Sequence, residues 1–172
     1  MVSKPGVFSW DRLDAGTYLL LEHLVVNSAD IVLDLGTGCG IIGAVAAVQA
    51  PQGYAYLVDA YIAAVNASRY TLEANDIHNA SALLSDVASD VRGISFDLVV
   101  TNPPFHLGVE SEYQVAAQFI RDAHAVLKIG GRLCLVANRF LKYERQIAEE
   151  FGNCRTVYSD SRYKILEATK RG

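Results

Sequence analysis

The sequence predicts an α/β domain built on a parallel sheet with helices on both faces. Short β-branched runs alternate along the chain with Ala-rich or amphipathic segments, the first run ends in a glycine-rich turn, and Pro or Gly separates most of the segments. Strands that alternate with helices pair in parallel, because each crossover helix packs back onto the sheet. Ligands of such folds bind beyond the carboxyl ends of the strands, where the strand order reverses.

Apolar periodicity gives the expected elements. Strands are short runs rich in β-branched and aromatic residues, and helices are longer segments whose apolar residues recur every three or four positions. The expected strands are residues 31–35, 54–58, 82–84, 96–101, 132–137, 155–159 and 163–169. The expected helices are residues 41–49, 60–74, 113–127 and 143–151. Gly130 and Gly131 are expected to terminate the third helix.

Composition indicates one globular domain over residues 1–172. Of the 172 residues, 51% are hydrophobic and 20% are charged, as in ordinary globular proteins. The first ten residues lack the apolar run of a signal peptide, and no stretch reaches the ~20 apolar residues of a membrane span. We therefore expect a cytoplasmic protein without a membrane partner. Cys39, Cys134 and Cys154 are expected to be reduced thiols.

The charge is divided unevenly along the chain. Up to residue 120 there are four basic and thirteen acidic residues, and from residue 121 onward eleven basic and six acidic. One interpretation is an ordinary solvated surface. The other is a basic C-terminal face for the phosphates of a nucleic acid, which need local rather than net positive charge. That face would include Arg139, Lys142, Arg145 and Lys164.

A glycine-rich turn follows the first strand, in the sequence DLGTGCG of residues 34–40. Glycines allow a tight turn and close approach to a ligand, and the next helix offers free N–H groups. The spacing is G-x-G-x-G, and Ile41 stands where the dinucleotide fingerprint has its third glycine. Asp34 precedes the first glycine by two residues, and a carboxylate there suits the α-ammonium group of S-adenosyl-L-methionine (AdoMet). The turn therefore favours AdoMet over a dinucleotide.

Two further aspartates follow the next two strands. A carboxylate at Asp59 can accept hydrogen bonds from both ribose hydroxyls of an adenosine, although an Asp here can also cap the following helix. Its distance of about twenty residues from the glycine turn favours the ribose. Asp86 follows the third expected strand and would lie near the adenine amino group, with a role in a cap or turn as the alternative.

The sequence TNPPF of residues 101–105 directly follows the fourth strand and is the most specific signal in the chain. The side-chain oxygen of Asn102 and the carbonyl of Pro103 can both accept hydrogen bonds from one NH₂ group, and the prolines fix the loop. Holding both N–H bonds turns the nitrogen lone pair toward a methyl donor. Phe105 can stack on a flat target, as aromatic residues stack on unpaired bases.

These three sites, in this order, resemble the class I AdoMet-dependent methyltransferases that carry an N-P-P-[FY] motif. Residues 5–9 (PGVFS), 13–17 (LDAGT), 102–106 (NPPFH) and 136–141 (VANRFL) are similar to the ribosomal RNA guanine-N2 methyltransferases. Within the methyltransferase small domain family, the small-subunit rRNA methyltransferase C group is the most similar. The resemblance implies a Rossmann-like fold, a seven-stranded, mostly parallel sheet with a reversed last strand.

The resemblance also implies a function, transfer of a methyl group from AdoMet to the exocyclic amine of guanine in ribosomal RNA, with S-adenosyl-L-homocysteine as product. An N-terminal segment and helix within residues 1–28 would cover the cofactor, and ribosomal RNA or a ribosomal subunit would be the partner. The expected catalytic residues are Asn102, Pro103 and Phe105. The expected cofactor-binding residues are Thr17, Asp34, Gly36, Thr37, Gly38, Gly40, Asp59, Ala60, Asp86, Val87 and Asn102.

The sequence is also compatible with other functions. A protein glutamine amide is the alternative acceptor, since release-factor methyltransferases share the N-P-P-[FY] motif. A catalytically silent AdoMet-binding module and a nicotinamide dehydrogenase are further alternatives, which the intact Asn102 and the glycine spacing respectively disfavour. No metal is expected, because the four histidines are scattered over four different segments and the chemistry needs none.

Overall fold

A computed structural model describes residues 13–104 and 109–172 of the chain. In these residues seven strands form one sheet, with five α-helices and one short 3-10 helix around it. The strands are β1 (Ile31–Leu35), β2 (Tyr54–Asp59), β3 (Ala80–Leu84), β4 (Phe96–Thr101), β5 (Leu127–Asn138), β6 (Arg155–Ser159) and β7 (Tyr163–Thr169). The helices are α1 (Ala15–His23), α2 (Ile41–Gln49), α3 (Ile62–Ala74), α4 (Val109–Val126), α5 (Tyr143–Phe151) and the 3-10 helix η1 (Ser89–Val91).

The strand order of the sheet is β3-β2-β1-β4-β5-β7-β6. The pairs from β3 to β5 are parallel, and β7 runs antiparallel to both of its neighbours. The predicted Rossmann-like sheet with a reversed last strand is therefore confirmed. The chain leaves β1 for β2 on one side and returns to β4 on the other side, so the order reverses between β1 and β4. The carboxyl ends of these two strands are where a ligand of such a fold binds.

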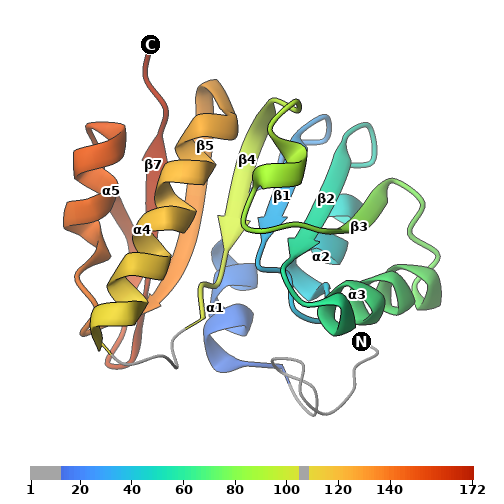
Figure 1. The fold of residues 1–172 in the computed structure, drawn as a ribbon, viewed down its shortest axis with the longest axis horizontal. Helices are drawn as coiled ribbons and strands as arrows, with labels where there is room; N and C mark the ends of the chain where they lie inside the picture. Colours follow the sequence, from blue (N-terminus) through green and yellow to red (C-terminus); the bar gives the residue numbers. More distant parts are fainter. Residues whose placement is uncertain (1–12, 105–108) are drawn as a thin grey trace.

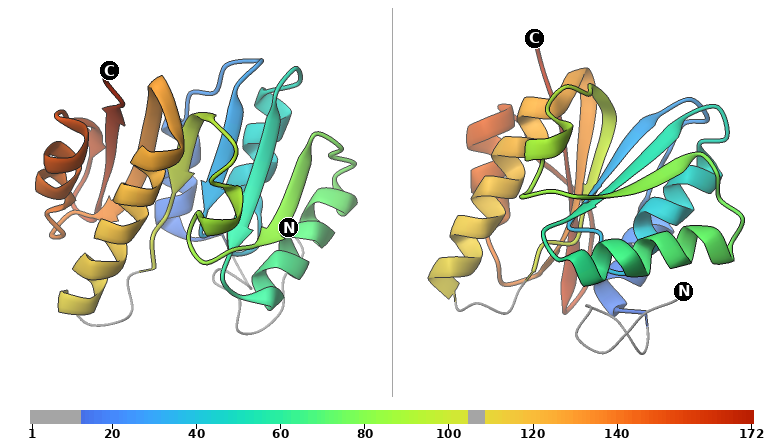
Figure 2. Two further views of the ribbon diagram at one scale, coloured as in Figure 1. Left: turned by 45° about the horizontal axis from the view of Figure 1, so that its top comes forward. Right: turned by 45° about the vertical axis from the view of Figure 1, so that its right-hand side comes forward.

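Two apolar layers cover the sheet, one on each face. Figures 1 and 2 show α4 and α5 on one face and α1 and α2 on the other. The first layer joins α4 and α5 to alternate residues of the central strands, such as Leu33 and Leu35. The second layer joins α1, α2 and α3 to the strand residues that point to the other face of the sheet, such as Val32. Successive side chains of a strand point to opposite faces, so the apolar residues of the segment 31–35 fill both layers.

The predicted elements are all present, with differences mainly at their ends. The helix expected at residues 113–127 begins earlier, at Val109, and ends at Val126. Gly130 and Gly131 do not end it, which corrects the prediction. They lie inside β5, whose pairing with β4 shifts register between Phe96 and Leu98. Gly130 has φ +83°, a left-handed conformation that lets the strand bulge there.

The described residues contain no helix long and apolar enough to cross a membrane. The three cysteines are free thiols, as expected from the sequence, and two of them, Cys39 and Cys134, are buried.

Candidate functional site at the ends of β1 and β4

The turn from β1 to α2 is built by glycines with left-handed backbone. Gly36, Gly38 and Gly40 have φ angles of +75°, +59° and +83°. A Cβ atom at Gly40 would lie 2.8 Å from the Cα of Ser68 in α3, so the position has neither the conformation nor the space for a side chain. The turn therefore lies close against α3, with its peptide groups at the carboxyl end of β1.

Two hydroxyl groups of α3 donate hydrogen bonds to backbone carbonyls of this turn. Ser68 Oγ donates to the carbonyl of Gly38 at 3.1 Å, and Thr71 Oγ1 donates to the carbonyl of Cys39 at 2.7 Å. Both side chains are buried. This pair cannot be recognised from the sequence alone, because the spacing of three along α3 is also that of an ordinary helix face. They fix where the carbonyls of the turn point, and so where its N–H groups point.

Asp34 lies fully buried beneath the turn. Its Oδ2 accepts hydrogen bonds from the Thr37 hydroxyl at 2.6 Å and from the Gly43 amide at 2.8 Å. Its Oδ1 is buried and has no hydrogen-bond partner among the described residues. Burial raises the pKa of this carboxyl group to about 7, against the lowering effect of the two hydrogen bonds, and the nearby charge of Asp59 raises it further. The buried oxygen without a partner is a position where a cationic group of a ligand would be stabilised.

Asp59, at the end of β2, connects the glycine turn to the start of α3. Its Oδ2 accepts from the amide of Gly38 and its Oδ1 from the amide of Tyr61, each at 3.0 Å. Asp59 is not the N-cap of α3, which begins at Ile62 with Tyr61 as its cap, so the capping alternative is wrong. An ionised carboxylate has about four acceptor positions, so this one can still accept both hydroxyls of a ribose.

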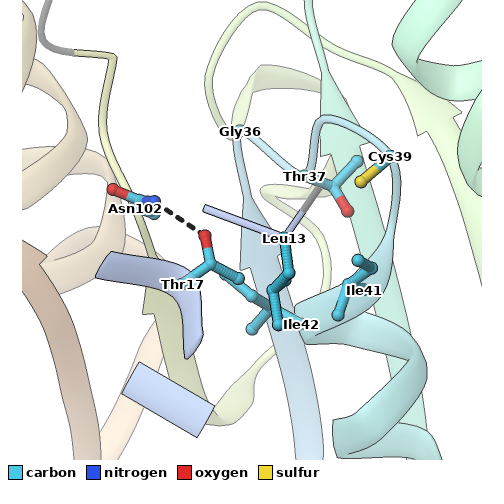
Figure 3. A pocket seen from close by; sticks show the side chains of 8 residues that line it. All are labelled: Leu13, Thr17, Gly36, Thr37, Cys39, Ile41, Ile42 and Asn102. Carbon is cyan, nitrogen blue, oxygen red and sulfur yellow. Dashed lines mark hydrogen bonds between the residues drawn. The ribbon is translucent and has the colours of Figure 1, made fainter. Parts of the chain in front are cut away.

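Asn102 follows β4 and is 8% exposed. Its Nδ2 donates to Thr17 Oγ1 at 2.9 Å and to Asp14 Oδ2 at 3.1 Å. Its Oδ1 is buried and has no hydrogen-bond partner among residues 13–104 and 109–172. Figure 3 shows the amide nitrogen turned toward Thr17 and the oxygen on the opposite side of the amide group. The site therefore presents one buried carbonyl-type acceptor, aimed away from the residues that hold it.

A pocket of about 330 Å³, partly open to solvent, lies between the glycine turn and Asn102 (Figure 3). The pocket joins predicted site residues to apolar residues that belong to none of the sequence motifs. Its lining residues are Leu13, Thr17, Gly36, Thr37, Cys39, Ile41, Ile42 and Asn102. An apolar wall next to a few polar groups is typical of sites for small organic molecules.

The other predicted site residues lie at the same edge of the sheet or outside the described residues. Ala60 and Asp86 are exposed after β2 and β3, and Val87 has φ +50° in the loop that leads to η1. The Asp86 carbonyl accepts from the Ser89 amide in this loop, as the turn alternative expects, which leaves its exposed carboxylate available. Pro103 is buried beside Asn102, and Phe105 lies outside the described residues.

The four basic residues predicted to form a C-terminal face lie in different environments. Arg139 and Lys142 are exposed in the segment between β5 and α5. Arg145 is exposed but forms an ion pair with Glu149 at 2.7 Å. Lys164 is wrongly predicted, because its side chain is 6% exposed and its Nζ donates to Glu144 Oε1 at 2.6 Å. In β7, alternate side chains point toward a helix-covered face, and this alternation buries Lys164.

The methyltransferase small domain family matches residues 1–167. Ribosomal RNA small subunit methyltransferase C of Yersinia enterocolitica is 41% identical over 165 residues, and that of Cronobacter sakazakii is 42% identical over 164 residues. The alignments cover 96% and 95% of this chain and 47% of each relative. The chain thus spans about half the length of the curated relatives that it matches.

Solved structures of methyltransferases also resemble this chain. The T. thermophilus 16S rRNA N2 methyltransferase (RsmC), in complex with AdoMet and guanosine, has a TM-score of 0.88 at 38% identity. The match covers 98% of this chain and 46% of that chain. A methyltransferase from Pyrococcus furiosus has a TM-score of 0.81 at 15% identity over 100% of this chain and 89% of its own, a likeness of fold alone.

Proposed function

Because this chain belongs to the methyltransferase small domain family, we propose that it transfers a methyl group from AdoMet to the exocyclic N2 amine of guanine in ribosomal RNA. The observation that carries the proposal is the buried Oδ1 of Asn102, which has no partner among the described residues and lies beside the pocket at the end of β4. The relatives named above, and a related structure with AdoMet and guanosine bound, support the choice of cofactor and acceptor.

The residues around the pocket fit AdoMet. The amides of Gly36, Gly38 and Gly40 are bonded to Val58, Asp59 and Thr37 within the protein, so the N–H groups left for a ligand are those of the first turn of α2. The unpartnered oxygen of Asp34 lies beneath the glycine turn, where an α-ammonium group would be stabilised. Asp59 has acceptor capacity for a ribose, and the apolar side chains of Ile41 and Ile42 line the pocket wall. When bound, AdoMet supplies an electrophilic methyl group, whose bond to sulfur breaks as the bond to nitrogen forms.

The chain itself has to orient the acceptor amine. The Oδ1 of Asn102 accepts one N–H of the amine, and the carbonyl of Pro103 is the acceptor that we propose for the other. With both N–H bonds held, the nitrogen lone pair points toward the methyl donor, which is catalysis by proximity and orientation. The nitrogen becomes acidic once it is methylated, so its proton leaves to water and no strong general base is needed. Phe105 would stack on the guanine.

A guanine within a duplex would have to be extruded to reach the pocket, or the target must be unpaired.

We propose that Arg139 and Lys142, exposed at the carboxyl end of β5, contact phosphates of the RNA beside this site. Each phosphate contact adds to the salt dependence of binding. The double change Arg139→Glu with Lys142→Glu should therefore flatten the slope of RNA affinity against salt concentration, while affinity for AdoMet is retained. An unchanged slope would remove these two residues from the RNA contact. A ribosomal RNA substrate also fits the expected cytoplasmic location. We further propose that residues 1–172 act as a single domain.

The test of the function is incubation with tritiated AdoMet and separated ribosomal RNA, ribosomal subunits and protein, followed by mass spectrometry of the labelled nucleosides. We expect N2-methylguanosine. Label only in protein, at glutamine, would overturn the proposal in favour of the amide acceptor, and no label in any fraction would favour a silent binding module.

The variant Asn102→Ala tests the mechanism. It should lower turnover by on the order of 10²-fold, the scale of losing one positioned polar contact at a reacting centre, with affinity for AdoMet within about threefold of the original. Asn79→Ala is a matched control, because the Asn79 amide also donates two hydrogen bonds, to the carbonyls of Ala47 and Ala50, at the opposite edge of the sheet. The control should lose stability and retain turnover. Full turnover of Asn102→Ala on guanine would refute the mechanism.

A further inference from the structure

Asn102 is held in place by the start of α1, a segment 85 to 88 residues away in the sequence. Its Nδ2 donates to Asp14 Oδ2 at 3.1 Å and to Thr17 Oγ1 at 2.9 Å. An ionised carboxylate only accepts hydrogen bonds, so the amide group that faces Asp14 must be the NH₂ group. Both amide hydrogens of Asn102 are thus used within the protein, and the buried Oδ1 is left as the one group of this amide without a hydrogen-bond partner among the described residues.

Asp14 is itself fixed in position. The same Oδ2 atom accepts from the backbone amide of Thr17 at 2.9 Å, and Asp14 is the N-cap of α1. A Cβ atom at Gly16 would lie 3.1 Å from this oxygen and 3.2 Å from the ring of Tyr163 in β7. The first turn of α1 is therefore packed closely against the sheet, and Gly16 is the small residue that permits this approach. The carboxylate that receives the Asn102 amide has little freedom to move.

The same short segment also reaches the cofactor side of the site. Leu13 and Thr17 line the pocket, and Thr17 bonds to Asn102 through its hydroxyl group. Thr17 thus contacts both the pocket and the residue that faces the acceptor. Asp14 is not among the pocket-lining residues. Its position allows it to act on Asn102 without direct contact with the proposed substrates.

We propose that Asp14, together with Thr17, is a positioning residue that locks the amide of Asn102 with its oxygen toward the acceptor amine; this inference rests on the function proposed above. An unrestrained Asn side chain can turn over and present its NH₂ group. Two donors would then face each other, and the acceptor amine would lose its hydrogen bond. Asp14 prevents this, because only the NH₂ group can bond to a carboxylate. The negative charge also polarises the amide and strengthens the hydrogen bond that Oδ1 accepts.

The role of Asp14 in capping α1 can be separated from its role toward Asn102. Ser, Asn and Asp are about equally good N-caps, so Asp14→Ser and Asp14→Asn both keep the cap of α1. The Asp14→Asn variant would retain an acceptor oxygen at the same reach but no charge, whereas the shorter Ser side chain cannot reach Asn102. We expect turnover to fall about three- to tenfold for Asp14→Asn and about ten- to a hundredfold for Asp14→Ser, with affinity for AdoMet within about threefold of the original.

Asp30→Asn is the matched control. Asp30 also accepts from a backbone amide, that of Asn27 at 2.9 Å, and from the side-chain amide of the same residue at 3.1 Å, but it precedes β1 at the opposite edge of the sheet. This variant should lower stability and leave turnover unchanged. If it lowers turnover as much as Asp14→Ser does, the effect of Asp14 is one of general stability and the proposal fails.

A measurement that needs no activity completes the test. The side-chain NH₂ protons of Asn102, followed by NMR in the protein alone, should exchange slowly with solvent in the original protein and about tenfold or more faster in Asp14→Ser. Equal exchange rates in the two proteins would overturn the positioning role, even if the wild-type enzyme methylates guanine. Slow exchange that depends on Asp14 would support it, even if the acceptor proved to be different from guanine.

Discussion

Replacing Gly40 by alanine tests whether the turn after β1 requires glycine for two separate reasons. The first is conformation, since Gly40 has φ +83°. The second is space, since a Cβ atom there would lie 2.8 Å from the Cα and 2.9 Å from the Cβ and Oγ of Ser68. The nearest of these atoms belongs to the backbone of α3, so a change of side-chain rotamer at Ser68 cannot remove the clash.

The two effects have different magnitudes and can be measured separately. A non-glycine residue in the left-handed region costs about 1–2 kcal/mol. Overpacking of a closely packed site adds about 1–3 kcal/mol, so Gly40→Ala should lower the free energy of unfolding by about 2–5 kcal/mol. Gly130 has the same φ angle of +83°, but a Cβ atom there would meet nothing within 4 Å. Gly130→Ala should therefore cost only the conformational part, about 1–2 kcal/mol.

Urea denaturation of both variants measures this difference, provided that the dependence of the unfolding free energy on urea concentration is unchanged. Calorimetric titration with AdoMet is the second assay. Gly40→Ala should bind AdoMet at least about tenfold more weakly, because a displaced turn moves the Gly38 carbonyl that Ser68 holds. Gly130→Ala, at the other end of the sheet, should bind normally. If the two variants lose the same stability to within about 0.5 kcal/mol, the steric part of the reasoning is refuted.

Two further predictions concern the carboxylates of the site. Asp59→Ala should weaken AdoMet binding by about 1.5–3 kcal/mol, the scale of hydrogen bonds to a charged acceptor, and unchanged affinity in calorimetry would exclude Asp59 as the ribose ligand. For Asp34, the pKa is raised from 3.8 to about 7 in the folded protein, so the folded state keeps a proton that the unfolded chain releases. The stability of the ligand-free protein should therefore fall as pH rises from about 4 to about 7 because of this group. Asp34→Asn keeps an acceptor for Thr37 and Gly43 and cannot ionise, so its stability relative to the original protein should rise over that range; a difference that stays constant from pH 4 to 7 would contradict the assignment.

The fold and two of the three strand-end motifs could be predicted from local features of the sequence. The run at residues 31–35 has a β-branched composition, and the glycines that follow it have positive φ angles that other residues adopt only with strain. Asn102 and Pro103 directly follow a strand of the same kind. In a parallel sheet such positions lie at one edge whatever the strand order, so the sequence was enough to expect that they share a site.

The predictions were wrong at positions whose structure depends on residues that are close in space but distant in the sequence. Gly130 and Gly131 follow a helix in the sequence and would end it, but β5 continues through them because β4 and β7 supply the pairing. The charge pattern predicts Lys164 on a basic surface, but this residue lies in β7 between β5 and β6, where its amino group pairs with Glu144 of α5. Neither the pairing strand nor the paired carboxylate can be identified from the residues next to these positions.

The sequence by itself determined the strand-helix order, the glycine turn and the presence of an asparagine side chain directly after the fourth strand, at residue 102. Only the tertiary structure decided how that amide is turned. Its two hydrogen-bond acceptors, Asp14 and Thr17, lie 88 and 85 residues away, and they meet Asn102 because α1 packs against β5, the strand that pairs with β4. Hydrogen bonds depend on distances of about 3 Å and on direction, and the folding of the whole chain sets both.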